Sequence, residues 1–133
     1  MKAYTDLKQS RKLAEILPIE SADMYYPNIL GIDNYPLPIY PLPIEWKNGL
    51  PLLSQEIPVW GLAALFDLLP NNEHITTILS RGSWKIDTVE YLPNTWWCEY
   101  EDTENQTEFH ISADNPVDAC VEMIIKLHEL NLL

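Results

Sequence analysis

Residues 115–133 read NPVDACVEMIIKLHELNLL. Asn115 is a favoured N-cap residue, Pro116 suits the first helical position, and Asp118 places a negative charge beside the exposed amides of the first turn. Apolar residues then recur at steps of three and four, which predicts one buried helical face. The residues of that face are Val117, Cys120, Val121, Ile124, Leu127 and Leu130. The sequence therefore predicts a docked C-terminal helix over residues 116–130 of a packed globular protein.

Two further helices and an extended arm are expected before this helix. Residues 5–17 have one apolar side, with Thr5 as the expected cap and Pro18 as the stop. Residues 58–69 are apolar on nearly every side, which is typical of a central buried helix. Residues 27–57 hold most of the eleven prolines, so we expect an extended, proline-rich arm that docks on the domain.

The apolar period changes to two between residues 74 and 112, which predicts β-strands. The expected strands are 74–79, 84–92, 96–102 and 107–112, and the expected turns are 81–83, 93–95 and 103–106. The last three strands would form an antiparallel meander. We therefore predict an α+β fold in a single domain over residues 1–133. Its three- or four-stranded antiparallel sheet would pack against the buried central helix and the C-terminal helix.

A four-residue tip at 103–106 fixes the pairing of the last two strands and the side chains on each face. The pairs on an apolar side are Tyr100 with Phe109 and Cys98 with Ile111. The pairs on an acidic side are Glu99 with His110 and Glu101 with Glu108. Because successive strand residues alternate, Trp96 and Trp97 must point to opposite faces, and one of them lies on the polar face.

The protein is strongly acidic, with 8 Lys and Arg against 20 Asp and Glu and a net charge of −12. Residues 71–133 hold three of the cations and twelve of the carboxylates. Such a surface repels nucleic acid and anionic membranes and favours basic partners. The sequence shows no targeting segment and no apolar run that could span a bilayer, and its two cysteines fit buried free thiols. A cytoplasmic location is therefore expected, and the oligomeric state stays open.

The spacing of reactive residues predicts neither catalysis nor a cofactor. Cys98, His110 and Asp114 could form a nucleophile, base and orienting group, but the meander puts Cys98 and His110 on opposite faces. The three histidines lack zinc-ligand spacing, and the acidic segment lacks the glycine and glutamate positions of an EF-hand loop. We expect no cofactor and no metal, and we regard an enzyme as the less favoured class.

The acidic hairpin is the strongest candidate for a partner-binding surface. Its carboxylates could occupy the basic groove of a nucleic-acid-binding protein, although a solvated hairpin kept monomeric by its charge is the simpler interpretation. Among the tryptophans, Trp60 and Trp84 are expected in the core, and Trp46 and Trp97 are candidates for exposure. The possible partner-binding residues are Glu99, Glu101, Asp102, Glu104, Glu108, Trp97 and Trp46.

Three blocks carry a resemblance to a known family. They are YTDL, KLAEILP and SADMY within residues 4–25, IPVWGLAAL within residues 57–70, and the closing stretch 115–133. On these blocks the chain resembles a family of short uncharacterised proteins from gut-dwelling anaerobic bacteria and their prophages or other mobile elements. The resemblance implies an intracellular bacterial or phage setting, and it brings no activity or functional residue with it.

Two classes of function follow from the sequence. The first is a non-catalytic interaction or regulatory protein that binds a basic macromolecular partner through the acidic hairpin and Trp97. The alternative is a binder of small molecules or peptides, less favoured as an enzyme, with an aromatic pocket between the proline-rich arm and the sheet. A deep pocket lined by Trp and His would favour the alternative, whereas a smooth acidic face would favour the first class.

Overall fold

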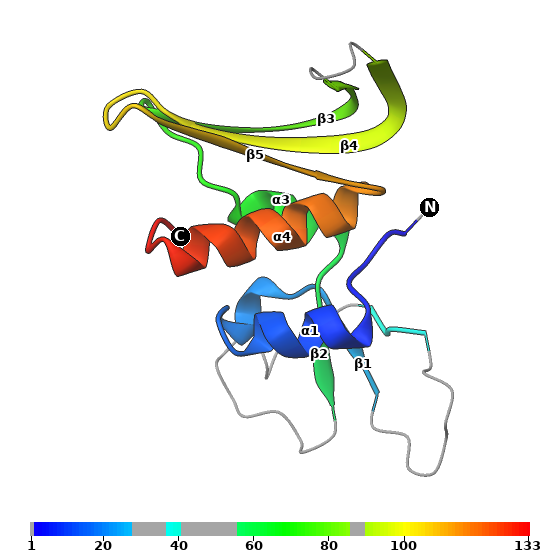
Figure 1. Ribbon diagram of the computed structural model, residues 1–133. Helices are drawn as coiled ribbons and strands as arrows, with labels where there is room; N and C mark the ends of the chain where they lie inside the picture. Colours follow the sequence, from blue (N-terminus) through cyan, green and yellow to red (C-terminus); the bar gives the residue numbers. More distant parts are fainter. Residues whose placement is uncertain (1, 28–36, 41–55, 86–89) are drawn as a thin grey trace. The chain divides into compact units, whose positions relative to one another are not determined.

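The computed structural model describes residues 2–27, 37–40, 56–85 and 90–133 (Figure 1). It divides into two compact units: the sheet unit, Met1–Lys2 and Phe66–Leu133, and the α1 unit, Ala3–Leu65. The described residues form helices and two antiparallel sheets, of two and three strands. The predicted α+β class is confirmed.

The α1 unit is built on a short two-stranded sheet. Strand β1 (Met24–Tyr26) pairs antiparallel with β2 (Ile57–Val59), and helix α1 (Leu7–Ala14) packs against β2. A 3-10 turn, η1 (Ile19–Ser21), lies between α1 and β1, and helix α3 (Leu62–Leu68) follows β2. The Trp60 side chain is fully buried, as predicted, and its indole nitrogen donates to Ser21 Oγ at 2.9 Å.

Helix α1 is shorter than the expected helix over residues 5–17. The cap is Asp6, whose carboxylate accepts from the Gln9 backbone N–H at 2.8 Å, while the Gln9 side chain accepts from the Asp6 N–H at 3.1 Å. Thr5 is fully buried instead, and its hydroxyl accepts from the Trp60 backbone N–H at 3.1 Å. The prediction of Thr5 as the cap is wrong because this threonine is used in a tertiary contact.

The helix expected over residues 58–69 is wrong in extent and in burial. Its first residues lie in β2, where Pro58 is paired with Tyr25 of β1. Only Leu65 is buried within α3, and Phe66 is 48% exposed. The pairing with β1 keeps this segment extended, and such a long-range contact leaves no mark on the local apolar pattern.

Most of the predicted proline-rich arm, residues 28–36 and 41–55, lies outside the described residues. Within residues 37–40, Ile39 forms an antiparallel bridge with Tyr25 of β1. The two backbone hydrogen bonds of the bridge are 3.0 and 2.7 Å long. This part of the arm therefore adds to the two-stranded sheet of its own unit.

The sheet unit holds three antiparallel strands in the order β3 (Ile75–Lys85), β4 (Glu90–Asp102) and β5 (Thr107–Ala113). Helix α4 (Pro116–Glu129) runs along one face and packs against β4 and β5 (Figure 1). We call this side of the sheet the inner face and the opposite side the outer face. Cys98 and Tyr100 are fully buried on the inner face. Tyr100 stacks on Phe109 at 4.9 Å, and Lys126 Nζ of α4 lies 4.7 Å from the Phe109 ring centre.

Helix α4 confirms the predicted C-terminal helix. Asn115 caps it, with its side-chain oxygen 2.8 Å from the Asp118 backbone nitrogen, and Pro116 opens the first turn. The helix ends at Glu129, one residue early, and Leu130 is 48% exposed rather than buried. The buried face is also wider than expected, because it includes Ala119 and Met123.

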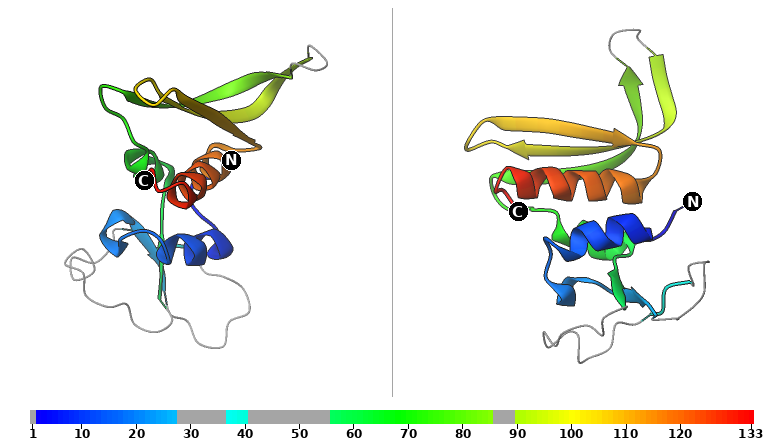
Figure 2. Two further views of the ribbon diagram at one scale, coloured as in Figure 1. Left: turned by 60° about the vertical axis from the view of Figure 1, so that its left-hand side comes forward. Right: turned by 60° about the horizontal axis from the view of Figure 1, so that its bottom comes forward.

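The strand expected over residues 84–92 and the turns beside it are wrong. Gly82 lies inside β3 with a φ of +87°, and residues 93–95 lie inside β4. The register shifts between Arg81 and Ser83, so that three residues of β4 oppose the single Gly82. The two segments predicted as turns, 81–83 and 93–95, therefore lie opposite each other in one β-bulge. Glycine tolerates the left-handed backbone there, and Pro93, which has no N–H, is not required to donate a hydrogen bond between the strands. Beyond this bulge the β3–β4 ribbon bends away from α4 (Figure 2).

Candidate functional site

The outer face of the three-stranded sheet brings together most of the predicted partner-binding residues. The register of β4 and β5 matches the prediction, with residues 102 and 107 closing the four-residue tip. Alternation along each strand then decides which side chains point away from α4. The outer-face residues are Thr76, Ile78 and Ser80 on β3, Trp97, Glu99 and Glu101 on β4, and Glu108, His110 and Ser112 on β5. Within the sheet unit no described element covers them (Figure 2).

Three carboxylates dominate this face. Glu101 lies directly opposite Glu108 in the strand ladder, and both are exposed. Glu99 is half-buried in the next row, between Ile78 of β3 and His110 of β5. Like charges placed directly opposite on paired strands destabilise a sheet, so the fold tolerates an unfavourable arrangement here.

An aromatic pair lies beside the carboxylates. Trp97 and His110 stack with ring centres 3.9 Å apart and ring planes 16° apart. In its own row Trp97 has only Ser80 and Ser112 as neighbours, so no large side chain stands beside the indole in that row. An indole next to carboxylates is a favourable environment for a cation, which gains both ring and ion-pair interactions.

In the sheet unit, the described side chains of Lys2, Arg81 and Lys126 interact away from the outer face. Lys2 forms an ion pair with Asp118 at 2.8 Å, and Lys126 lies over Phe109 on the inner face. Arg81 pairs with Trp96 in the ladder, on the inner-face side, and Nη2 of Arg81 donates to the Asn94 side chain at 3.2 Å. Among the side chains that the structure describes, the outer face thus carries carboxylates without a matching Lys or Arg.

Asp102 does not belong to the outer face, contrary to its inclusion in the predicted cluster. Its side chain is buried on the inner side and organises the β4–β5 turn by accepting three hydrogen bonds. The donors are the backbone amides of Glu104 and Asn105, at 3.0 and 3.1 Å, and the Asn105 side-chain amide at 2.8 Å. The bonds from Asn105 hold the pKa of Asp102 below its usual range. Glu104 lies at the tip, with Oε2 4.0 Å from His74 Nε2.

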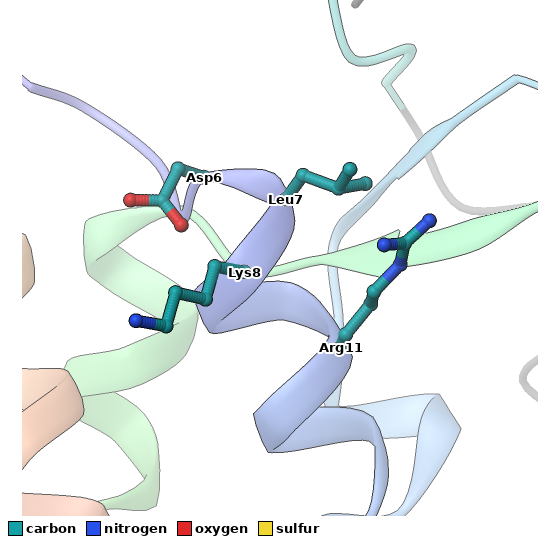
Figure 3. A pocket seen from close by; sticks show the side chains of 4 residues that line it. All are labelled: Asp6, Leu7, Lys8 and Arg11. Atoms are coloured by element: carbon teal, nitrogen blue, oxygen red, sulfur yellow. The ribbon is translucent and has the colours of Figure 1, made fainter.

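The other predicted tryptophan, Trp46, lies outside the described residues, and so does most of the arm that would form the aromatic pocket. An open cavity of about 450 Å³ lies along α1, lined by Asp6, Leu7, Lys8 and Arg11 (Figure 3). Figure 3 shows Lys8 and Arg11 projecting from α1 in different directions. A smaller cavity of about 290 Å³ in the sheet unit is lined by Phe66, Asp67, Leu69, Asn71 and Thr77. Neither described lining contains Trp or His, so neither cavity matches the predicted pocket.

The candidate nucleophile Cys98 and the candidate base His110 lie on opposite faces of the sheet. Cys98 is buried on the inner face whereas His110 is exposed on the outer face, so the predicted separation of the two is confirmed. In the described part of the chain, no group of His, Cys, Asp and Glu side chains could hold a metal ion. The helices described there are all too short or too polar to cross a membrane.

Ile78 is an apolar outer-face residue that is absent from the predicted partner-binding set. It is 52% exposed and lies opposite Glu99, because β3 rather than a separate strand at 84–92 is the neighbour of β4. The strand alternation of side chains through residues 75–80 was the sequence signal for the position of Ile78. The turn residues at 81–83 concealed it, because they suggested that the strand ended before it could pair with β4.

Comparison with known proteins adds no relative. No family model, curated protein or solved structure matches this chain. The resemblance to proteins of gut bacteria and their prophages stays a prediction.

Proposed function

We propose that this protein is a non-catalytic interaction or regulatory protein whose outer sheet face binds a basic macromolecular partner. The observation that carries the proposal is the combination on one face of Glu99, Glu101 and Glu108 with the stacked Trp97 and His110. A basic protein surface complements both the charge and the aromatic character of this face.

The arrangement of the carboxylates supports binding over solubility alone. Solubility requires only that charged side chains be distributed over the surface. It does not require two like charges directly opposite each other on paired strands. Here Glu101 opposes Glu108, and the apolar Ile78 is left 52% exposed beside them. Both features are unfavourable in the free protein, and both become favourable when a cationic, partly apolar surface covers them.

Arginine is the side chain that best fits the aromatic part of the face. Its planar guanidinium can stack on an indole and form paired hydrogen bonds with a carboxylate at the same time. Trp97 and Glu99 offer these two groups in adjacent rows of the sheet. A cation on an aromatic face contributes roughly 0.5–2 kcal/mol, depending on how far it is desolvated.

A sharper form of the proposal is that the face imitates a nucleic-acid backbone and blocks a DNA-binding protein. The carboxylates would then occupy the groove that normally binds phosphates, where regular negative charge attracts Lys and Arg. Duplex DNA should compete with this protein for such a partner. A cytoplasmic setting in a bacterium, with a prophage or mobile-element origin, is part of the same proposal.

The test compares two triple variants of equal net charge. In the face variant, Glu99, Glu101 and Glu108 are replaced by Gln. In the control variant, the exposed carboxylates Glu20, Glu73 and Glu122 are replaced by Gln. An arginine-rich synthetic peptide is titrated into each protein at low and high salt, and the dissociation constant is measured by calorimetry.

The face variant should bind the peptide at least about tenfold more weakly than the control, a difference of about 1.4 kcal/mol. Binding to the unmodified protein should weaken steeply as salt rises, because exposed charges are screened. Equal affinities for the two variants would show that net charge alone attracts the peptide, and the proposed face would then be wrong.

A further inference from the structure

The two cysteines of the chain, Cys98 and Cys120, are fully buried free thiols that the proposed binding face does not use. Cys98 lies on the inner face of β4, the central strand. Cys120 lies in the first half of α4, the helix that packs on β4 and β5. The two thiols therefore come from opposite sides of the core of the sheet unit.

The two side chains are neighbours in the core between β4 and α4. Both are fully buried, and each is the group with the largest effect on the pKa of the other. The Cys120 side chain lowers the pKa of Cys98, against the opposing effect of burial, and Cys98 raises the pKa of Cys120. Cys98 is thus the sulfur favoured as the thiolate. A disulfide requires sulfur atoms that can approach without a large movement of the backbone, and two buried thiols on elements that pack together favour such an approach.

We propose that Cys98 and Cys120 form a reversible disulfide that joins β4 to α4 when the protein meets a low-molecular-weight disulfide such as oxidised glutathione. The Cys98 thiolate attacks one sulfur of the small disulfide, which forms a mixed disulfide and releases one small thiolate. Cys120 then loses its proton and attacks the Cys98 sulfur, which forms the protein disulfide and releases the second small thiolate. The small thiolates take up the two protons, so two protein thiols are oxidised and one small disulfide is reduced.

Burial controls how this reaction proceeds. Both thiols have 0% exposure, so an oxidant reaches them only when α4 opens locally from the sheet. Oxidation should therefore be slow in the folded protein and should stop at the disulfide, because reclosure brings the second thiol back to the first. The chain has no third cysteine to compete.

The disulfide would lie directly behind the proposed binding face. The neighbours of Cys98 in sequence, Trp97 and Glu99, both point to the outer face. A covalent bond from Cys98 to α4 would fix this part of β4 in place. The disulfide itself is independent of the proposed function, and its test involves no partner.

The test uses the full chain in two arms. In the first, the folded protein is incubated in glutathione buffers of rising oxidised fraction, free thiols are alkylated, and intact mass and peptide maps are recorded. In the second, the chain is oxidised in denaturant at low concentration, so that access is not limiting, and is then refolded by dilution. Cys98→Ser and Cys120→Ser are the matched controls in both arms.

The expected product is a protein lighter by two hydrogen atoms, with Cys98 and Cys120 in one linked peptide. The refolded oxidised chain should show the native spectrum. Its melting temperature should be higher by on the order of 10 °C, because the bond closes a loop of roughly 20 residues. Reduction should reverse the change. The proposal is overturned if the oxidised chain fails to regain the native spectrum or melts below the reduced protein. It is also overturned if glutathione stays attached to Cys98 in the folded protein without closure to Cys120.

Discussion

Replacing Glu101 by Gln should stabilise the folded protein, although it removes part of the proposed binding face. Glu101 lies directly opposite Glu108 on paired antiparallel strands, and both side chains are exposed. Cross-strand pairs contribute roughly 0.2–1 kcal/mol in either direction according to their charges. For two exposed carboxylates we expect a gain of about 0.5 kcal/mol in the free energy of unfolding at low salt.

Urea unfolding measures this gain. With a denaturant slope near 2 kcal/mol per molar, the unfolding midpoint of Glu101→Gln should rise by about 0.25 M. Glu101→Lys replaces repulsion by attraction to Glu108, so its midpoint should rise by about twice as much. Both gains should shrink in 1 M salt, where the screening length falls to about 3 Å.

The control is Glu73→Gln, which changes the net charge equally at an exposed position outside the strand ladder. If Glu101→Gln lowers the midpoint at low salt, or raises it no more than the control does, the two carboxylates do not oppose each other. Such a result would contradict the direct pairing of Glu101 with Glu108 on the outer face.

Three other predictions concern the sheet unit. Tyr100→Phe removes a buried hydroxyl that has no hydrogen-bond partner among the described residues. The free energy of unfolding should therefore rise, or fall by no more than about 0.5 kcal/mol, and a larger fall would show that the hydroxyl has a partner. Asn115→Ala removes the cap of α4 and should cost about 1 kcal/mol in the same urea assay, and an unchanged midpoint would contradict the cap. Because hydrogen bonds from Asn105 lower the pKa of Asp102, its carboxylate should stabilise the turn fully above about pH 4. That contribution should fade as the pH falls through the lowered pKa of Asp102 in the folded protein. In Asp102→Asn, the free energy of unfolding should no longer show this fall at acidic pH.

The parts of the fold that could be predicted from the sequence are those with local causes. Asn115, Pro116 and the spacing of apolar residues define α4 without reference to any other element. The β4–β5 hairpin was predictable because a short tip joins two alternating segments, and alternation then fixes which side chains share a face. The acidic outer face followed from that register.

The errors arise where distant segments decide the structure. Gly82 and Pro93 are strong turn signals separately, but they oppose each other in one bulge, so the strands continue past both. The extended conformation of β2 depends on β1, which lies some thirty residues earlier in the chain. In the sequence, Asp102 resembles the acidic residues around it. The structure distinguishes it from them, because its carboxylate accepts three hydrogen bonds within the β4–β5 turn.

The most direct test of the central proposal is to locate a bound basic peptide on the isotope-labelled full chain by NMR. We predict that an arginine-rich peptide shifts the Trp97 indole and His110 ring signals and the amide signals of β4 and β5, with little change in α1 or α4. The same titration of the face variant, with Gln at Glu99, Glu101 and Glu108, should leave these signals in place. Shifts spread evenly over the acidic surface, or centred away from the outer face, would contradict the proposal.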